Sequence, residues 1–167
     1  MTLSGKGRRA KGMSGQREVA ELLRPIWPEA HSGYWQHTGG DACADVEGTP
    51  YFIEVKRGTC SRYKALWQAT DNADSVDDRV PVAFTRRDRM PWLVSMWNDN
   101  FCNLAMCADM KFDRVMPTRA YEQMGELNWS TVFVEYGNET PCIGYVTCLA
   151  SVWIEMVRRA EASDCDK

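Results

Sequence analysis

The segment between Asp45 and Lys56 limits the fold of this chain more than any other part of the sequence. Its middle is rich in turn-forming residues, and the residues after the turn alternate between apolar and polar side chains, as a strand does. A turn centred between Thr49 and Pro50 puts Asp45 directly opposite Glu54 on the neighbouring strand, with Cβ atoms about 4.5–5.5 Å apart. The segment therefore predicts a hairpin that brings two carboxylates together.

Lys56 lies on the same strand face as Glu54, about 7 Å further along it. Two carboxylates so close repel each other unless a cation lies between them, and oxygen-rich sites of this kind favour Mg²⁺ or Mn²⁺. A lysine beside them can orient and polarise a water molecule, or neutralise charge on a phosphate. A surface hairpin with ordinary charges explains the same residues. Asp41 is a competing carboxylate, about 13 Å away along an extended chain, which reaches the pair only if the loop folds back.

Apolar spacing along the rest of the chain predicts alternating helices and strands. Helices are expected over residues 14–24, with Ser14 as the N-cap, and over 62–73, 98–111 and 143–160. Strands are expected over residues 51–56, 80–85, 92–97 and 131–136. This order is typical of an α/β or α+β protein with a mixed sheet. At 167 residues the chain is long enough for one domain with a sizeable core and too short for two comfortable ones.

The formal net charge of −3 does not by itself indicate a nucleic-acid binder. Residues 1–12 depart from this average, because they combine glycines with four cations and no acid: Lys6, Arg8, Arg9 and Lys11. They predict a flexible basic arm, which is either a solvated tail or a segment that seeks phosphates. A second basic cluster is expected in the turn between two strands, formed by Arg86, Arg87 and Arg89.

The seven cysteines and two histidines do not predict a metal site or a disulfide framework. The cysteine count is odd and no CxxC occurs, so reduced thiols in a cytosolic protein are expected. The N-terminus is polar and basic, unlike a signal peptide. The longest apolar run, about residues 143–157, is too short for a bilayer span and contains Glu155. A cytoplasmic protein without a membrane partner is expected.

Asp45 followed by Glu54-Val55-Lys56 resembles the signature of the PD-(D/E)XK nucleases, with Ala44 in place of the usual proline. The surroundings are similar to phage members of the archaeal-type Holliday-junction resolvase family. The matching blocks are residues 11–20, 45–50, 53–57 and 81–94, together with Gln68. The resemblance covers roughly residues 8–97 and does not extend to residues 98–167.

The resemblance implies a restriction-endonuclease-like core with a central mixed sheet flanked by helices. This core spans about residues 13–97 of a single domain over 13–167, with residues 98–167 as a C-terminal elaboration. The resemblance also implies a homodimer that cleaves branched DNA with Mg²⁺ (or Mn²⁺). Asp45, Glu54 and the backbone carbonyl of Val55 would hold the metal, and Lys56 would activate the attacking water. The implied basic rim around this centre consists of the N-terminal arm with Arg57, Arg86, Arg87 and Arg89.

The first helix departs from the family pattern. Aligning its apolar positions puts Gln16 where the family has a glutamate, and Glu18 lies two residues on, about 200° around the helix. A neutral amide can hold a metal-bound water but adds no negative charge, so weaker binding of a second metal is expected. In the family a glutamine at the position of Gln68 faces the active site, whereas the sequence alone suits an exposed helical glutamine equally well.

The sequence thus predicts a metal-dependent, structure-selective endodeoxyribonuclease of the resolvase type, phage-encoded and acting in the host cytoplasm. One alternative keeps the nuclease fold but acts on flaps, ends or nicks. A second is a DNA-binding protein on a catalytically weakened nuclease core, which Gln16 favours. A third is a structural protein that binds no nucleic acid, which the net acidity favours.

Overall fold

The computed structural model describes residues 5–33, 43–76, 78–112, 114–117, 131–136 and 144–164. The chain is an α/β protein that forms two compact units, Met1–Met90 and Pro91–Lys167. Each unit contains a mixed set of strands together with helices. The boundary at Met90 lies close to residue 97, the expected end of the nuclease-like core.

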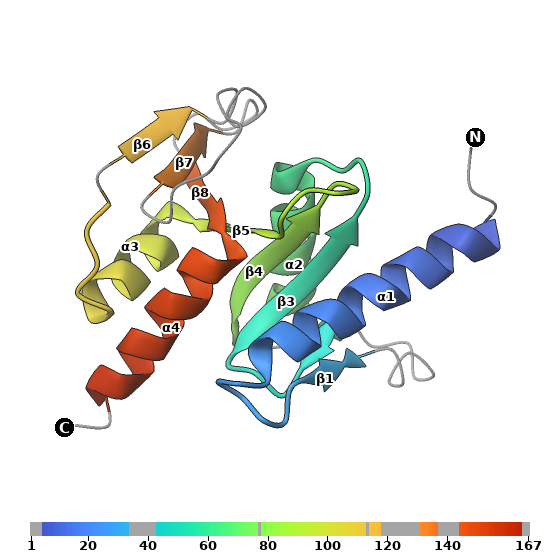
Figure 1. Cartoon of the computed structure of the whole chain (residues 1–167), viewed down its shortest axis with the longest axis horizontal. Helices are drawn as coiled ribbons and strands as arrows, with labels where there is room; N and C mark the ends of the chain where they lie inside the picture. Colours follow the sequence, from blue (N-terminus) through green and yellow to red (C-terminus); the bar gives the residue numbers. More distant parts are fainter. Residues whose placement is uncertain are drawn as a thin grey trace. The chain divides into compact units, whose positions relative to one another are not determined.

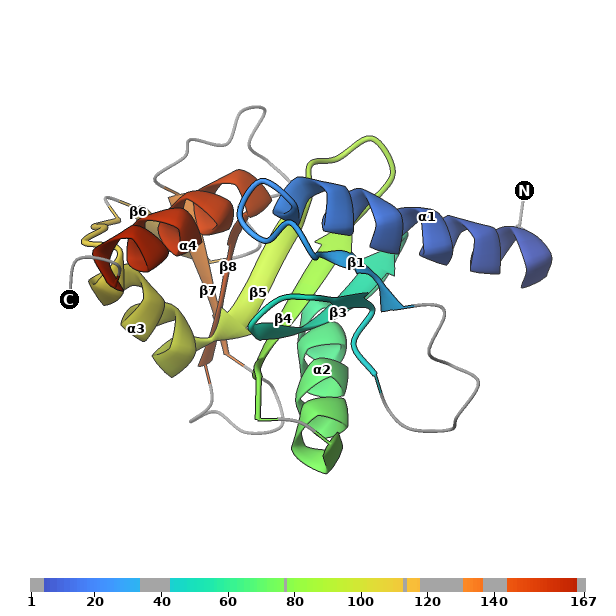
Figure 2. The ribbon, with the colours of Figure 1, turned by 90° about the horizontal axis from the view of Figure 1, so that it is seen from below.

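The first unit has two helices on opposite faces of its sheet (Figures 1 and 2). Across the sheet lie β1 (His31–Ser32), β2 (Val46–Glu47), β3 (Tyr51–Arg57) and β4 (Val80–Arg86), in that order. The pairs β1–β2 and β2–β3 are antiparallel, and β3–β4 is parallel. The helices are α1 (Gly5–Leu23) and α2 (Arg62–Val76).

Strand β3 is buried on both faces, which the alternating sequence did not predict. All four residues from Phe52 to Val55 are buried, Glu54 among them. The reason is that α1 supplies Val19 and Leu23 to the core while α2 covers the other side, as is usual for a strand in a parallel pair. The acidic side chain of Glu54 therefore lies in a largely dry environment.

The second unit carries strands β5 (Leu93–Trp97), β8 (Gly144–Leu149), β7 (Thr131–Tyr136) and β6 (Arg114–Pro117), adjacent in that order. The pairs β5–β8 and β7–β8 are antiparallel, and β6–β7 is parallel. Helices α3 (Asn98–Cys107) and α4 (Ala150–Asp164) pack against each other. The core of this unit contains the fully buried indole of Trp153, whose Nε1 donates a hydrogen bond to Met96 Sδ over 3.0 Å.

Two expectations about the N-terminal residues are wrong. Residues 5–12 are not a flexible arm, because α1 begins at Gly5, and Ser14 is therefore inside the helix and is not its N-cap. An ion pair of 2.6 Å between Lys11 and Asp88 ties this part of the helix to the turn that follows β4. The side chains of Lys6 and Arg8 lie outside the part of the chain that the structure describes.

The helix expected over residues 143–160 is also partly wrong. Residues Gly144–Leu149 form strand β8, and the helix begins only at Ala150. Antiparallel pairing with β5 and β7 on both sides outweighs the apolar helical spacing of this stretch. The strand expected over 131–136 is confirmed as β7. Within the described residues, no helix has the length and apolar character needed to cross a bilayer.

Candidate active site

The hairpin of β2 and β3 has the register that the turn predicted. Val46 is the partner of Ile53, and the backbone N–H of Asp45 donates to the carbonyl of Ile53 over 2.8 Å. Asp45 is therefore opposite Glu54. Gly48 adopts a φ of +78°, and a Cβ there would lie 2.3 Å from the carbonyl oxygen of Glu29. The turn that sets this register thus requires glycine at that position.

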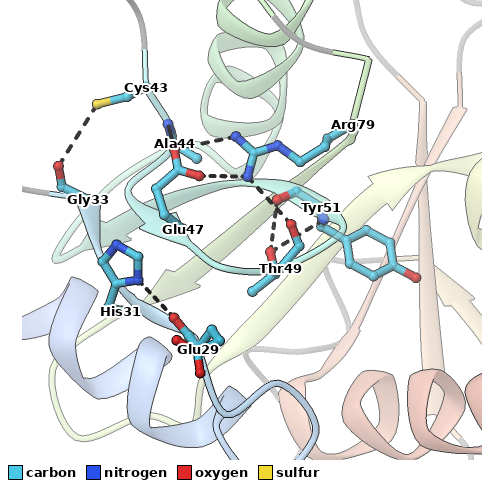
Figure 3. Close-up of polar contacts among 9 residues, drawn as sticks. All are labelled: Glu29, His31, Gly33, Cys43, Ala44, Glu47, Thr49, Tyr51 and Arg79. Carbon is cyan, nitrogen blue, oxygen red and sulfur yellow. Dashed lines mark hydrogen bonds and ion pairs between the residues drawn. The ribbon is translucent and has the colours of Figure 1, made fainter. Parts of the chain in front are cut away.

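A partly buried ion pair between Arg79 and Glu47 holds this hairpin, and sequence reasoning missed it (Figure 3). Arg79 Nη1 lies 2.7 Å from Glu47 Oε2, and Glu47 Oε1 also accepts the backbone N–H of Ala44 over 3.0 Å. The Arg79 guanidinium carbon lies 5.4 Å from the centre of the Phe52 ring. No local sequence pattern indicates this pair, because Arg79 precedes a different strand. It fixes the residue just before Asp45.

The carboxylate of Asp45 is held by groups from two elements, β3 and α1. Its Oδ2 accepts the backbone N–H of Val55 over 2.8 Å, and its Oδ1 accepts the side-chain amide of Gln16. The Gln16 Oε1 in turn accepts the hydroxyl of Ser32 over 3.0 Å. The structure therefore brings Gln16, and not Glu18, to Asp45. Ser32 was not a sequence candidate, and its place follows only from the pairing of β1 with β2.

Glu54 is 4% exposed, and Lys56 donates a hydrogen bond to its Oε1. The pKa of Glu54 is raised to about 7, first by burial and then by the nearby charge of Asp45, while Lys56 acts in the opposite direction. A carboxylate whose pKa is raised by a second carboxylate is a group that gains from a cation placed between the two. The predicted trio of Asp45, Glu54 and Lys56 is thus together in one place.

Glu18 lies in a different environment, which corrects its candidacy as a metal ligand. Its two carboxylate oxygens are paired with Arg57 Nη1 at 2.7 Å and with Arg86 Nη2 at 2.6 Å. Ser14 Oγ also donates to Glu18 over 3.1 Å. Two guanidinium groups thus engage the oxygens that a metal would need.

The remaining candidates are spread over the rim of the first unit. Arg86 is the last residue of β4 and not part of the turn, where Arg87 and Arg89 are exposed. Arg9 is exposed on α1, and Gln68 is exposed on α2. Asp41 lies outside the residues that the structure describes.

The donors at the site suit a hard divalent cation that keeps part of its water shell. In the described part of the chain, no group of three or more His, Cys, Asp or Glu side chains is placed to hold a metal. The two carboxylates of Asp45 and Glu54 are nevertheless opposed, and the carbonyl of Val55 lies on the same strand. Mg²⁺ commonly binds through one or two carboxylates and completes its shell with water and substrate phosphate. The residues present fit such an ion.

The comparisons with known proteins gave no relative. No family model matches the chain, no curated protein matches it, and no solved structure matches it.

Proposed function

We propose that this chain is a Mg²⁺-dependent endodeoxyribonuclease that cleaves branched DNA, with a restriction-endonuclease-like core in its first unit. The observation that supports the proposal best is the opposed pair of Asp45 and Glu54 with Lys56 bonded to Glu54. These are the residues that carry the resemblance to the PD-(D/E)XK nucleases and to the phage branch of the archaeal-type resolvases. That resemblance also implies a homodimer, phage origin and action in the host cytoplasm.

Each residue has a defined task in phosphodiester hydrolysis. Mg²⁺ held by Asp45, Glu54 and the Val55 carbonyl would supply Lewis-acid activation of the phosphate and of a water molecule. Lys56 holds the attacking water and stabilises negative charge on the phosphate. The backbone N–H of Val55 fixes the Asp45 carboxylate, so that it is oriented before the ion arrives. Burial makes a lone charge on Glu54 costly, so cation binding and ionisation of Glu54 favour each other.

A second candidate function is a DNA-binding protein on a catalytically weakened core. The contact from the Gln16 amide to Asp45 favours it, because a neutral N–H donor lies against an oxygen that a metal would need. In that case the carboxylate pair would bind metal weakly, and the basic rim would carry the function.

One experiment separates the candidates. Purified protein is incubated with labelled four-way junction, flap and duplex DNA in Mg²⁺, in Mn²⁺ or in EDTA. Selective cleavage of the junction supports the proposal. Cleavage of flaps or ends alone would mean that the protein is a nuclease with a different DNA substrate. Binding without cleavage in either metal supports the second candidate.

Variants tie any cleavage to this site. Glu54→Gln should abolish cleavage and keep junction binding equal or tighter, because a negative charge near phosphate is removed. Lys56→Ala should lower the rate about 100-fold or more, the usual scale for a group that acts on the reacting atoms. If either variant cleaves within a few-fold of the parent protein, the assignment of the active site is wrong.

A further inference from the structure

Two arginines lie side by side at the ends of β3, which carries Glu54 and Lys56, and of its parallel neighbour β4. Arg57 and Arg86 are register partners on the parallel strands β3 and β4, and Arg57 directly follows Lys56. Neighbouring strands lie about 4.8 Å apart, so the positively charged guanidinium groups of these two residues are expected to repel each other.

One carboxylate holds this pair together. One carboxylate oxygen of Glu18 forms an ion pair with Arg57 at 2.7 Å, and the other forms an ion pair with Arg86 at 2.6 Å. Ser14 Oγ accepts from Arg57 Nη1 over 3.1 Å and donates to Glu18. The two arginine side chains are only 22–23% exposed, so their orientations are fixed by these contacts.

The cluster keeps an excess of positive charge and of donors. Glu18 offsets one of the two guanidinium charges, and the nearby carboxylate of Asp88 is paired with Lys11. Three cations thus face two carboxylates, and each guanidinium has five N–H donors. The Nε of Arg57 is buried and has no hydrogen-bond partner among the described residues. Ser14 and Glu18 also form part of the wall of a shallow cavity of about 330 Å³ that includes the exposed Arg17.

We propose that Glu18 is a positioning residue that holds Arg57 and Arg86 as a clamp for a single DNA phosphate beside the candidate active site. The inference rests on the proposed DNA substrate. A phosphodiester offers two non-bridging oxygens, and fixed guanidinium groups bind such oxygens with two parallel hydrogen bonds. Because Glu18 orders both side chains beforehand, less conformational entropy is lost when the phosphate binds.

Charge alone and positioning predict opposite effects for Glu18→Gln. The substitution makes the protein more positive, so a carboxylate that only repels DNA would leave binding tighter when removed. A carboxylate that orders the two arginines would leave binding weaker, in spite of the added positive charge. Whether Glu18→Gln binds DNA more tightly or more weakly than the parent protein therefore decides between simple repulsion and positioning.

The chain offers a matched control in Glu155. It also holds two arginines, Arg158 at 3.0 Å and Arg159 at 2.9 Å, but on helix α4 of the second unit. Glu155→Gln thus makes the same change of charge and breaks the same number of ion pairs, in the unit that does not carry the candidate site.

The experiment is fluorescence anisotropy of the full chain with a fluorescein-labelled four-way junction in EDTA, over a series of salt concentrations. We expect Glu18→Gln to weaken binding about three- to tenfold, the scale of one charge-assisted contact. Glu155→Gln should leave it equal or slightly tighter. Arg57→Gln and Arg86→Gln should each lower the slope of log K against log salt by up to about 0.9. Arg57→Lys, which keeps the charge but not the planar group, should weaken binding more than Arg158→Lys does.

Binding by Glu18→Gln as tight as or tighter than by Glu155→Gln overturns the inference. So does a parent protein that does not bind the junction, or unchanged slopes in both arginine variants. If Glu18→Gln does not fold, as thermal unfolding would show, the comparison of the two lysine variants decides in its place. Because no metal is present, a clamp can be found in a protein that never cleaves DNA, which would contradict the proposed function and leave this inference standing.

Discussion

Gln16 is the residue that most affects the metal dependence proposed for this site. Its amide N–H donates to Asp45, and its carbonyl accepts from Ser32. We expect Gln16→Glu to put a third carboxylate against Asp45 and Glu54. This variant should lower the divalent-ion concentration for half-maximal cleavage by roughly tenfold, because each added anionic oxygen strengthens binding of a hard cation. Metal titrations followed by cleavage and by calorimetry measure the change.

The control for Gln16→Glu is Glu18→Gln, which should leave the metal requirement unchanged, since Glu18 faces Arg57 and Arg86. In EDTA, Gln16→Glu should also unfold at a lower temperature than the parent and recover when Mg²⁺ is added. A metal requirement that shifts with Glu18→Gln and not with Gln16→Glu would mean that Glu18 is the ligand.

Glu54 should make the metal-free protein less stable as the pH rises. Its pKa is about 7 in the folded chain and near its ordinary value of 4.5 in the unfolded chain. The unfolded state therefore loses its proton first, so stability is fully present below pH 4.5 and falls between there and pH 7. The loss is roughly 3 kcal/mol, because the pKa differs between 4.5 and about 7 and a difference of one in pKa is about 1.4 kcal/mol.

Glu54→Gln removes this titration. In EDTA, the free energy of unfolding of the variant relative to the parent should rise between pH 5 and pH 8 in urea denaturation. Glu21→Gln, at an exposed carboxylate of α1, serves as the control for the substitution itself. A difference for Glu54→Gln that does not change with pH would mean that Glu54 is not buried beside Asp45.

At the scale of elements, the hairpin of β2 and β3 depends on a contact from outside it. Glu47 and Arg79 are 15% and 22% exposed, and Arg79 also stacks over Phe52. We expect Arg79→Gln to lower the free energy of unfolding by about 1–2 kcal/mol, between the values for exposed and for fully buried pairs. A double-mutant cycle with Glu47→Gln, followed by urea denaturation, measures the coupling.

The matched control is the exposed pair of Glu21 and Arg24 on α1, where Arg24→Gln should cost less than about 0.5 kcal/mol. Because Ala44 also donates to Glu47, the Arg79 variant should loosen Asp45 and slow cleavage, whereas Arg24→Gln should not. Equal stability of both variants would show that the hairpin holds its register without the ion pair.

At this scale the sequence could predict those features that depend on neighbouring residues in the chain. The turn around Thr49 and Pro50 set the register of the hairpin, and β7 had the predicted bounds. The rest depended on partners distant in the sequence. Burial of Glu54 follows from helices on both faces, and β8 follows from pairing with strands on either side. For the same reason Ser32 and Arg79 carried no signal of their own.

At the scale of the whole molecule, a net charge of −3 conceals an uneven distribution. Exposed cations of the first unit include Arg9 on α1 and Arg89 in the turn that follows β4. Others are already compensated, as Lys11 is by Asp88 and as Arg79 is by Glu47. The sequence alone could not separate these two kinds of cation, because the pairing partners lie far along the chain. DNA binding should therefore depend on particular cations and not on the total charge.

This distinction gives a prediction for the N-terminal residues. Deleting residues 1–11 removes Lys6, Arg8, Arg9 and Lys11 together with the first turns of α1. Junction binding in EDTA should weaken, and the slope of log K against log salt should fall by up to about 0.9 for each removed cation that contacts a phosphate. Among single variants, Arg9→Gln should lower the slope more than Lys11→Gln, because Lys11 is held by Asp88. Salt titrations of fluorescence anisotropy measure all three proteins. An unchanged slope after the deletion would mean that this end of α1 does not touch DNA, whereas a larger effect of Lys11→Gln would mean that the pair with Asp88 opens when DNA binds.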